Sequence, residues 1–314
     1  MSDLVVRKLR FAFAATEVPF VWNESNPAFS SMANAVSFLA VGFEKMIGGM
    51  ISEAMPLIQD PKIASEAKAF VRQEGQHSTA HLQHVNALIR RYPGLQKTLD
   101  DVVADFDRLT ATTPVRYRLA YTADLEATFT PTFKMMLDND STLFAPGDDR
   151  VASLFLWHFV EEVEHRSSAL IIYDEVIGSQ WYRMRMAPSI FRHVMHALRI
   201  ACEGFNEHVP LDDRRLDAMS MFRTHAMTKS LRQRLPFIRA PYDGPFADAF
   251  AHVSARELFD ALSGVVRSQI PGHDPAGEAL PALADEWFSR YEAGYDVTRW
   301  YTANRADDAN TAHA

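Results

Sequence analysis

Apolar residues recur at alternating steps of three and four along four long stretches of the chain. This spacing predicts helices that each bury one face. The stretches run from about Ser30 to Met55, from Pro61 past Leu88, from Pro114 past Phe133, and from Asp149 to Val176. Hardly any segment alternates in the two-residue period of a strand, so an all-α fold is expected.

Each predicted helix carries acidic or imidazole side chains in the middle of its apolar face. A buried carboxylate costs several kcal/mol unless it is paired or bound to a metal. Groups on four faces therefore need a common partner. These residues are Glu44 on the first helix, Glu74, His77 and His81 on the second, Glu126 on the third, and His158, Glu162 and His165 on the fourth.

The loops between the helices bring these groups to one height. Glu44 and Glu74 lie 12 and 13 residues from the ends of the loop that joins their helices, and Glu126 and Glu162 lie 12 and 13 residues from theirs. Equal arms of an antiparallel helix pair place both carboxylates level, because each residue advances about 1.5 Å. The sequence thus predicts two structurally similar helix pairs.

Two Glu-x-x-His pairs, at residues 74–77 and 162–165, are the central motif. Side chains three residues apart on a helix lie about 60° apart and can face one metal ion. With Glu44 and Glu126 on the partner helices, the set comprises four carboxylates and two imidazoles. Two divalent cations would leave it close to neutral. Ferritin-like dimetal carboxylate proteins use this ligand set.

His158 lies on the same narrow face as Glu162 and His165. The pattern His-x-x-x-Glu-x-x-His resembles the diiron arylamine N-oxygenases, in which an additional histidine is a seventh ligand. Residues 30–210 also resemble a bacterial ferritin-like family described only as predicted metal-dependent hydrolase. The resemblance implies a ferritin-like four-helix bundle with additional C-terminal helices. It also implies seven metal ligands: Glu44, Glu74, His77, Glu126, His158, Glu162 and His165.

Three further residues are candidates for supporting the ligands. His81 follows His77 by one helical turn and either replaces His158 as the extra ligand or supports a ligand by a hydrogen bond. Glu161 either orients a ligand histidine or forms a solvated or inter-helix ion pair. Tyr121 lies near ligand height on the third helix. His84 is expected near the surface.

Mixed carboxylate and imidazole ligands suit iron or manganese, and zinc less well. The first hypothesis is a diiron oxidase or oxygenase, which activates dioxygen to oxidise a small organic substrate and needs an external electron donor. The alternative is a dimetal hydrolase. A third hypothesis is a ferritin-like metal binder without catalytic activity.

Composition excludes several other classes. The 32 Lys and Arg residues against 40 Asp and Glu give a net charge of −8, which argues against nucleic-acid binding. The single cysteine, Cys202, excludes an internal disulfide framework. No clean apolar run reaches the roughly 18 residues of a membrane span, and no export signal is evident. A cytoplasmic protein is expected, and a homodimer is compatible with the pattern.

The chain divides into four expected parts. Residues 1–29 form an N-terminal arm. Residues 30–210 form the bundle, which includes a crossing helix from Leu95 to Leu109 and a fifth long helix from Trp181 to about Glu207. Residues 211–301 form a helical extension with pieces at Ser254–Ser268 and Ala279–Ala293. Residues 302–314 are polar and small, and are expected to be a disordered tail.

Overall fold

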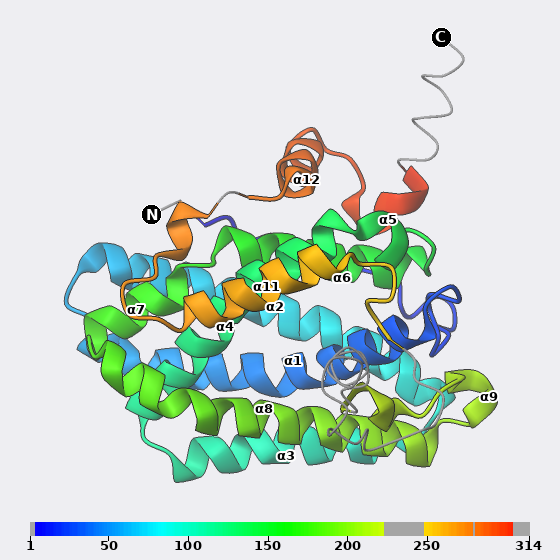
Figure 1. Cartoon of the computed structure of the whole chain (residues 1–314), viewed down its shortest axis with the longest axis horizontal. Coiled ribbons are helices and arrows are strands. Elements are labelled where there is room, and N and C mark those ends of the chain that lie inside the picture. The colour runs from blue at the N-terminus through cyan, green and yellow to red at the C-terminus, as the bar shows by residue number, and fades with distance from the viewer. Residues whose placement is uncertain (1–3, 223–247, 279, 304–314) are drawn as a thin grey trace, which may run out of the picture.

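The computed structural model describes residues 4–222, 248–278 and 280–303, and every regular element in these ranges is a helix (Figure 1). The prediction of an all-α fold is confirmed. The long helices are α1 (Pro27–Ala54), α2 (Pro61–Arg91), α3 (Leu95–Thr112), α4 (Val115–Asp138), α6 (Asp149–Glu164), α7 (Ser168–Val176), α8 (Gln180–His208), α11 (Ala255–Ser268) and α12 (Ala282–Glu292). Short helical turns are η1 (Met55–Leu57), α5 (Asp140–Leu143), α9 (Leu211–Arg214), η2 (Ala218–Phe222), η3 (Pro275–Gly277) and η4 (Val297–Arg299).

Local sequence sets where the principal helices begin. The side chains of Asn26, Asp60 and Asp148 each accept a hydrogen bond from a backbone N–H in the first turn of α1, α2 and α6, respectively. Proline follows directly in α1 and α2, where its fixed φ and missing N–H suit the first helical position. These caps place the starts of α1, α2 and α6 within a few residues of the predicted positions.

Four helical units enclose the core. Helix α1 packs on α2, and α4 packs on α6 and α7, while α1 also contacts α4 and α2 contacts α6. The two predicted helix pairs are therefore present and packed together. A specific relation to the ferritin-like bundle stays a prediction.

The predicted crossing helix, Leu95–Leu109, corresponds to α3, which follows α2 and precedes α4 in the chain. It lies along α1 and α8 on one side of the molecule (Figure 1). Small residues permit this packing, since a Cβ at Gly42 of α1 would lie 2.6 Å from the ring of Phe106, and one at Gly204 of α8 would collide with Thr98. The buried face of α3 thus covers the outside of the first pair.

The fourth predicted helix, Asp149–Val176, is broken in two. Helix α6 ends at Glu164, and His165 adopts a cap conformation with φ −94° and ψ 14°. Arg166 replaces the lost helical bonds in part, because its side chain donates to the carbonyl oxygen of Val163 and also to those of Pro275 and Glu278. The second Glu-x-x-His pair therefore ends at a helix terminus and does not lie in mid-helix.

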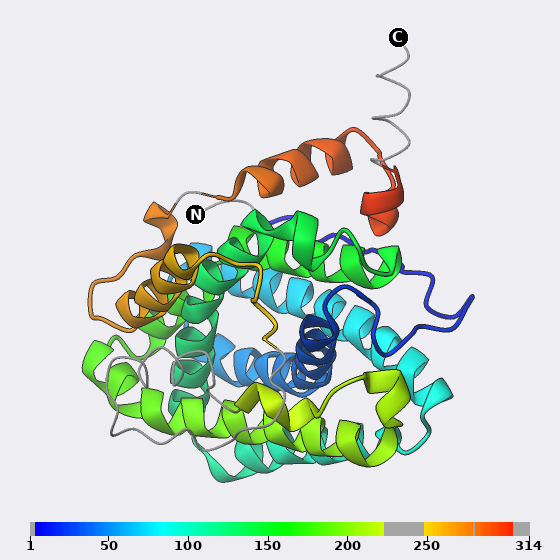
Figure 2. The same cartoon turned by 45° about the vertical axis from the view of Figure 1, so that its right-hand side comes forward.

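The arm and the C-terminal extension both pack on the bundle. Residues 4–26 have no regular helix but bury four aromatic side chains, Phe11, Phe13, Phe20 and Trp22. Helix α11 packs on α4, where Gly264 lies against Pro131. Helix α12 lies outside the bundle on the side of α6 (Figures 1 and 2).

The predicted tail falls mainly outside the described residues, which end at 303. Its first residue is ordered by the bundle, since the Thr302 hydroxyl donates to the carboxylate of Asp149 at 2.5 Å.

Within the described part of the chain, the stretch Pro27–Leu57 is long and apolar enough to cross a membrane by length and composition. However, 72% of its most apolar portion is buried inside the fold, as in a core helix.

Candidate metal centre

All seven predicted ligand side chains converge on one point in the core. They come from α1, α2, α4, α6 and the residue that caps α6, and none is more than 4% exposed. Their potential ligand atoms form overlapping groups in which every atom lies within 4.8 Å of the others. The fold thus brings together residues that are up to 121 positions apart in the sequence.

Four such groups overlap. Glu44, Glu74 and His77 form one group, and His77, His158 and Glu162 form another. Glu74 and Glu162 recur in a third group with Glu126 and His165, and the fourth comprises Glu44, His81 and His158. The carboxylates Glu44, Glu74 and Glu162 thus each belong to two groups.

Several buried oxygens of the cluster have no hydrogen-bond partner. Both carboxylate oxygens of Glu74 and Glu126 are in this position, as are one oxygen of Glu44 and the Nδ1 atom of His77. Buried polar atoms are rarely left without partners, since each costs about 1–3 kcal/mol. A pair of cations would satisfy these atoms together, so the donor set fits a dinuclear metal site.

Burial and mutual repulsion raise the pKa of most of the carboxyls. The pKa of Glu44 and of Glu126 lies well above the ordinary value because burial disfavours the charged form. Burial likewise raises the pKa of Glu74 to about 7. Glu162 is the exception, because bonds from His158, His165 and His77 overcome its burial and hold its pKa well below the ordinary value.

His77 and His165 each use one ring nitrogen to contact a partner outside the cluster. His77 Nε2 donates to Glu161 at 2.9 Å, and His165 Nδ1 donates to the Gln73 side-chain oxygen at 3.0 Å. The opposite nitrogen of each ring then faces the carboxylates. Although burial opposes their charge, the acidic partners raise the pKa of His77 to about 10 and that of His165 well above its usual value.

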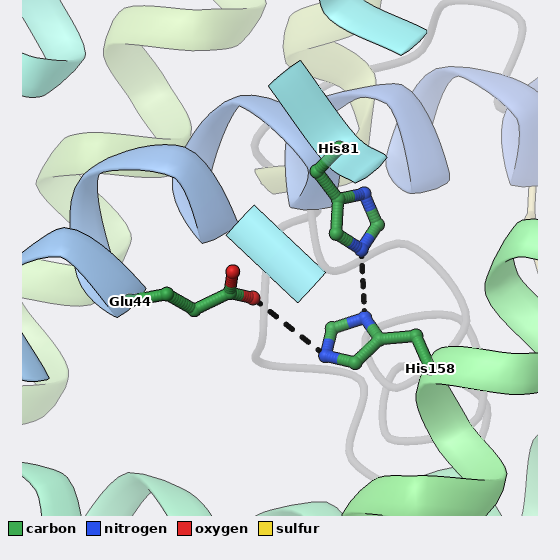
Figure 3. A group of neighbouring side chains, drawn as sticks. All are labelled: Glu44, His81 and His158. Carbon is green, nitrogen blue, oxygen red and sulfur yellow. Dashed lines mark hydrogen bonds and ion pairs between the residues drawn. The ribbon is translucent and has the colours of Figure 1, made fainter. Parts of the chain in front are cut away.

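His158 is held differently, by a chain of neutral groups. Its Nε2 lies 2.8 Å from Glu162. The same nitrogen lies 3.7 Å from Glu44, and Nδ1 lies 2.8 Å from His81 Nε2 (Figure 3). The Ser37 hydroxyl lies 2.9 Å from Nδ1 of both His81 and His84. Burial lowers the pKa of His158 to about 4 and that of His84 to about 3.

This geometry bears on the choice between His81 and His158. His158 faces Glu44 and Glu162, whereas His81 lies behind it and bonds its far nitrogen. His81 also belongs to a group of possible ligand atoms with Glu44 and His158, so both histidines stay candidates for the extra ligand. The expectation that His84 lies near the surface is wrong, because its side chain is fully buried.

Two other expectations have different outcomes. Glu161 is fully buried and bonds His77, as a residue that orients a ligand histidine would. The structure places Tyr121 elsewhere, since its hydroxyl bonds Nδ1 of His193 on α8 at 3.0 Å. Helix α8 covers this part of α4, a contact that the spacing within α4 could not reveal.

Three further residues contact the cluster although the sequence did not predict them: Arg7, Gln73 and Ser37. Gln73 directly precedes Glu74 in the sequence, and this position next to a predicted ligand could have identified it. Ser37 lies two turns before Glu44 on the same apolar face of α1, where a buried serine needs a partner. Arg7 has no such signal, because only the path of the arm brings it to the cluster.

Comparison with known proteins assigns a broad class. A family model described as predicted metal-dependent hydrolase matches residues 5–244, which is 240 of the 314 residues. No curated protein and no solved structure matches the chain.

Proposed function

Because this chain belongs to the predicted metal-dependent hydrolase family, we propose that its buried cluster binds two divalent metal ions and catalyses a hydrolytic reaction. The observation that supports this most directly is that Glu74 and Glu162 each belong to two of the overlapping groups of possible ligand atoms, which we interpret as two subsites. A single-metal site would not need shared carboxylates. The carboxylate oxygens without partners support the same proposal.

The proposal assigns a role to each ligand. Glu74 and Glu162 would serve both ions. Glu44, His77 and His158 would complete the ligands of one ion, and Glu126 and His165 those of the other. Four carboxylates carry four negative charges, which two divalent ions balance, so the buried site becomes close to neutral.

When bound, the metal pair supplies Lewis-acid polarisation of the substrate and activation of water. The residues of the chain set the geometry for this chemistry. Glu161 and Gln73 orient His77 and His165 so that the opposite nitrogen of each ring faces the cluster, where it could bind a metal ion in place of its proton. Trp157 packs edge-on against His77 at 4.9 Å and Phe70 against His165 at 5.1 Å between ring centres, which excludes water behind the ligands.

Oxidation of a small organic substrate with dioxygen is the second candidate. Its support is the donor set itself, since four carboxylates and three imidazoles suit iron or manganese better than zinc. The family description favours hydrolysis, and the suggested relation to the arylamine N-oxygenases stays a prediction. An external electron donor belongs to this second candidate alone.

Metal loading and gas phase separate the two candidates. The purified protein is stripped of metal, reloaded with Zn²⁺, Mn²⁺ or Fe²⁺, and assayed under argon with nitrophenyl acetate and bis-nitrophenyl phosphate. Hydrolysis is supported if the metal-loaded protein turns over a substrate without dioxygen or reductant and the metal-free protein does not. Dioxygen consumption by the Fe²⁺ form with added reductant, without turnover under argon, would support oxidation instead.

A stoichiometry of two metal ions per chain is expected in either case. Elemental analysis of the loaded protein measures it directly. Binding of one ion or none would contradict the dinuclear proposal itself.

A further inference from the structure

One arginine of the N-terminal arm contacts the outer partners of the cluster. The guanidinium of Arg7 donates to Glu161 at 2.9 Å and to both oxygens of Glu164 at 2.8 and 3.0 Å. Arg7 is only 4% exposed although it lies in a segment without regular secondary structure. A buried arginine needs such paired acceptors to offset the loss of its hydration.

The contacts of Arg7 lead to a histidine of each subsite. Through Glu161 it reaches Nε2 of His77. Through Glu164 it reaches Gln73, whose amide nitrogen donates to Glu164 at 2.9 Å and whose oxygen accepts from His165 Nδ1. One side chain therefore connects the two outer hydrogen bonds that fix the orientations of both rings.

Aromatic side chains of α12 cover the guanidinium on its other side. The guanidinium carbon lies 4.7 Å from the ring centre of Phe288, 5.4 Å from that of Tyr291 and 5.8 Å from that of Trp287. Cations above aromatic faces are stabilised, more so where water is excluded. The arm and α12 thus meet at the residue that connects both histidines.

We propose that Arg7 is a positioning residue for both metal subsites, which acts on His77 through Glu161 and on His165 through Glu164 and Gln73. This inference rests on the proposed dinuclear centre. It assigns to the arm and α12 a function beyond covering the bundle, because their docking holds the ligand histidines in the metal-binding orientation. Thermodynamic linkage then requires that metal binding stabilises the docked arm by the same free energy.

Stepwise binding of Co²⁺ to the full chain tests the proposal. Arg7→Met keeps the length of the side chain but removes its charge and its bonds with both carboxylates. Loss of an outer hydrogen-bond partner of a ligand typically weakens metal affinity about 10–100-fold. Both binding steps should weaken by a factor in this range, because Arg7 serves a histidine of each subsite.

Gln73→Leu provides a matched comparison. This variant removes the hydrogen-bond acceptor of His165 and keeps the hydrogen bond between His77 and Glu161. Only one of the two Co²⁺-binding steps should therefore weaken. Arg10→Met controls for the loss of one positive charge on the same arm, since Arg10 is exposed. Its two affinities should stay within about threefold of the wild type, a range well below the expected loss.

Arg7→Lys replaces Arg7→Met in the Co²⁺-binding experiment if Arg7→Met does not fold. A lysine retains the charge but cannot hold both carboxylates in a forked geometry. Circular dichroism establishes which variants keep their helices. A folded Arg7 variant that weakens both steps supports the proposal, and a folded variant with wild-type affinities or with only one weakened step overturns it.

Hydrogen exchange supplies a readout that does not depend on affinity. Amides of residues 4–13 and 282–292 should exchange more slowly in the Co²⁺-loaded wild type than in the metal-free protein. Equal exchange rates would overturn the linkage between arm docking and metal binding. If the wild type itself binds no Co²⁺, the dinuclear proposal fails; if the wild type binds two ions and Arg7→Met binds them equally well, only the role of Arg7 fails.

Discussion

Two sides of the same buried cluster hold their histidines by opposite means. His77 and His165 lie on a side where Glu161, Glu164 and Arg7 supply charge. On the other side, His158 is supported by a neutral chain through His81, Ser37 and His84. All three ligand histidines are almost completely buried, and yet the pKa is about 10 for His77 and about 4 for His158.

Burial opposes the charge of both rings, but bonds with Glu161 and Glu162 raise the pKa of His77, whereas repulsion from His77 further lowers the pKa of His158. A carboxylate that accepts from the outer nitrogen makes the ring a stronger base, and hence a stronger metal donor. A neutral histidine in the same place adds no such charge. The site therefore has one side on which a carboxylate supports a histidine, at His77, and another on which a neutral histidine does so, at His158.

The largest expected effect comes from removing the carboxylate that both sides share. Glu162 accepts from His158 at 2.8 Å and from His165 at 3.0 Å, and it belongs to groups in both subsites. Glu162→Ala should abolish the binding of both metal ions, because neither subsite keeps its bridge. Elemental analysis should find less than one ion per chain.

Glu203→Ala is the matched control. Glu203 is an exposed residue of α8, and its one ion pair among the described residues is with Arg199. This variant should retain two ions. Two ions retained in Glu162→Ala would show that the two subsites are not bridged as proposed.

A smaller effect should distinguish the two kinds of support. Glu161→Gln removes the negative charge behind His77, and His81→Gln replaces one neutral partner of His158 by another. We expect about 10–100-fold weaker binding of Co²⁺ for Glu161→Gln and less than tenfold for His81→Gln. Competition with a chromophoric chelator measures both constants.

The order of the two variants is the decisive result. If His81→Gln weakens binding as much as Glu161→Gln, charge is not what separates the two sides, and hydrogen-bond geometry alone would explain the support.

The smallest effect concerns stability in the metal-free protein. His84 has a pKa of about 3 in the fold, lowered by burial, against about 6.5 in an unfolded chain. Between these values the unfolded state binds the proton, so stability contributed by neutral His84 is present above pH 6.5 and is lost as the pH falls. The loss is about 1.4 kcal/mol for each pH unit in this range.

His84→Gln removes this titration and keeps a side chain that can bond Ser37. Urea unfolding measures the free energy of unfolding at pH 6.5 and at pH 5.5. Between these two pH values the wild type should lose about 1 kcal/mol more of it than His84→Gln loses. Equal losses would mean that His84 is not held neutral, and that the chain on the side of His158 carries charge.

Most of the fold and the convergence of the candidate ligands could be predicted because they depend on short-range patterns. The three-and-four spacing predicted the long helices, and the caps at Asn26, Asp60 and Asp148 set three of their starts. Equal distances from the loops predicted that Glu44, Glu74, Glu126 and Glu162 would meet, as they do. A helix has a fixed rise per residue, so counting residues is enough to compare heights.

The break after Glu164 was not predictable from the local pattern. The segment contains no proline or glycine at the break, and its apolar spacing continues to Val176. Arg166 stabilises the break with carbonyl groups of residues 275–278, more than 100 positions later in the chain.

The sequence by itself determined which side chains could bind metal and at what height on their helices, because helical periodicity and buried charge follow from neighbouring residues. Only the tertiary structure decided how those side chains are held. Arg7 reaches Glu161 across 154 positions, and His81 reaches His158 across 77. Such contacts depend on the path of the arm and on how separate helices pack, and no local rule of spacing encodes either.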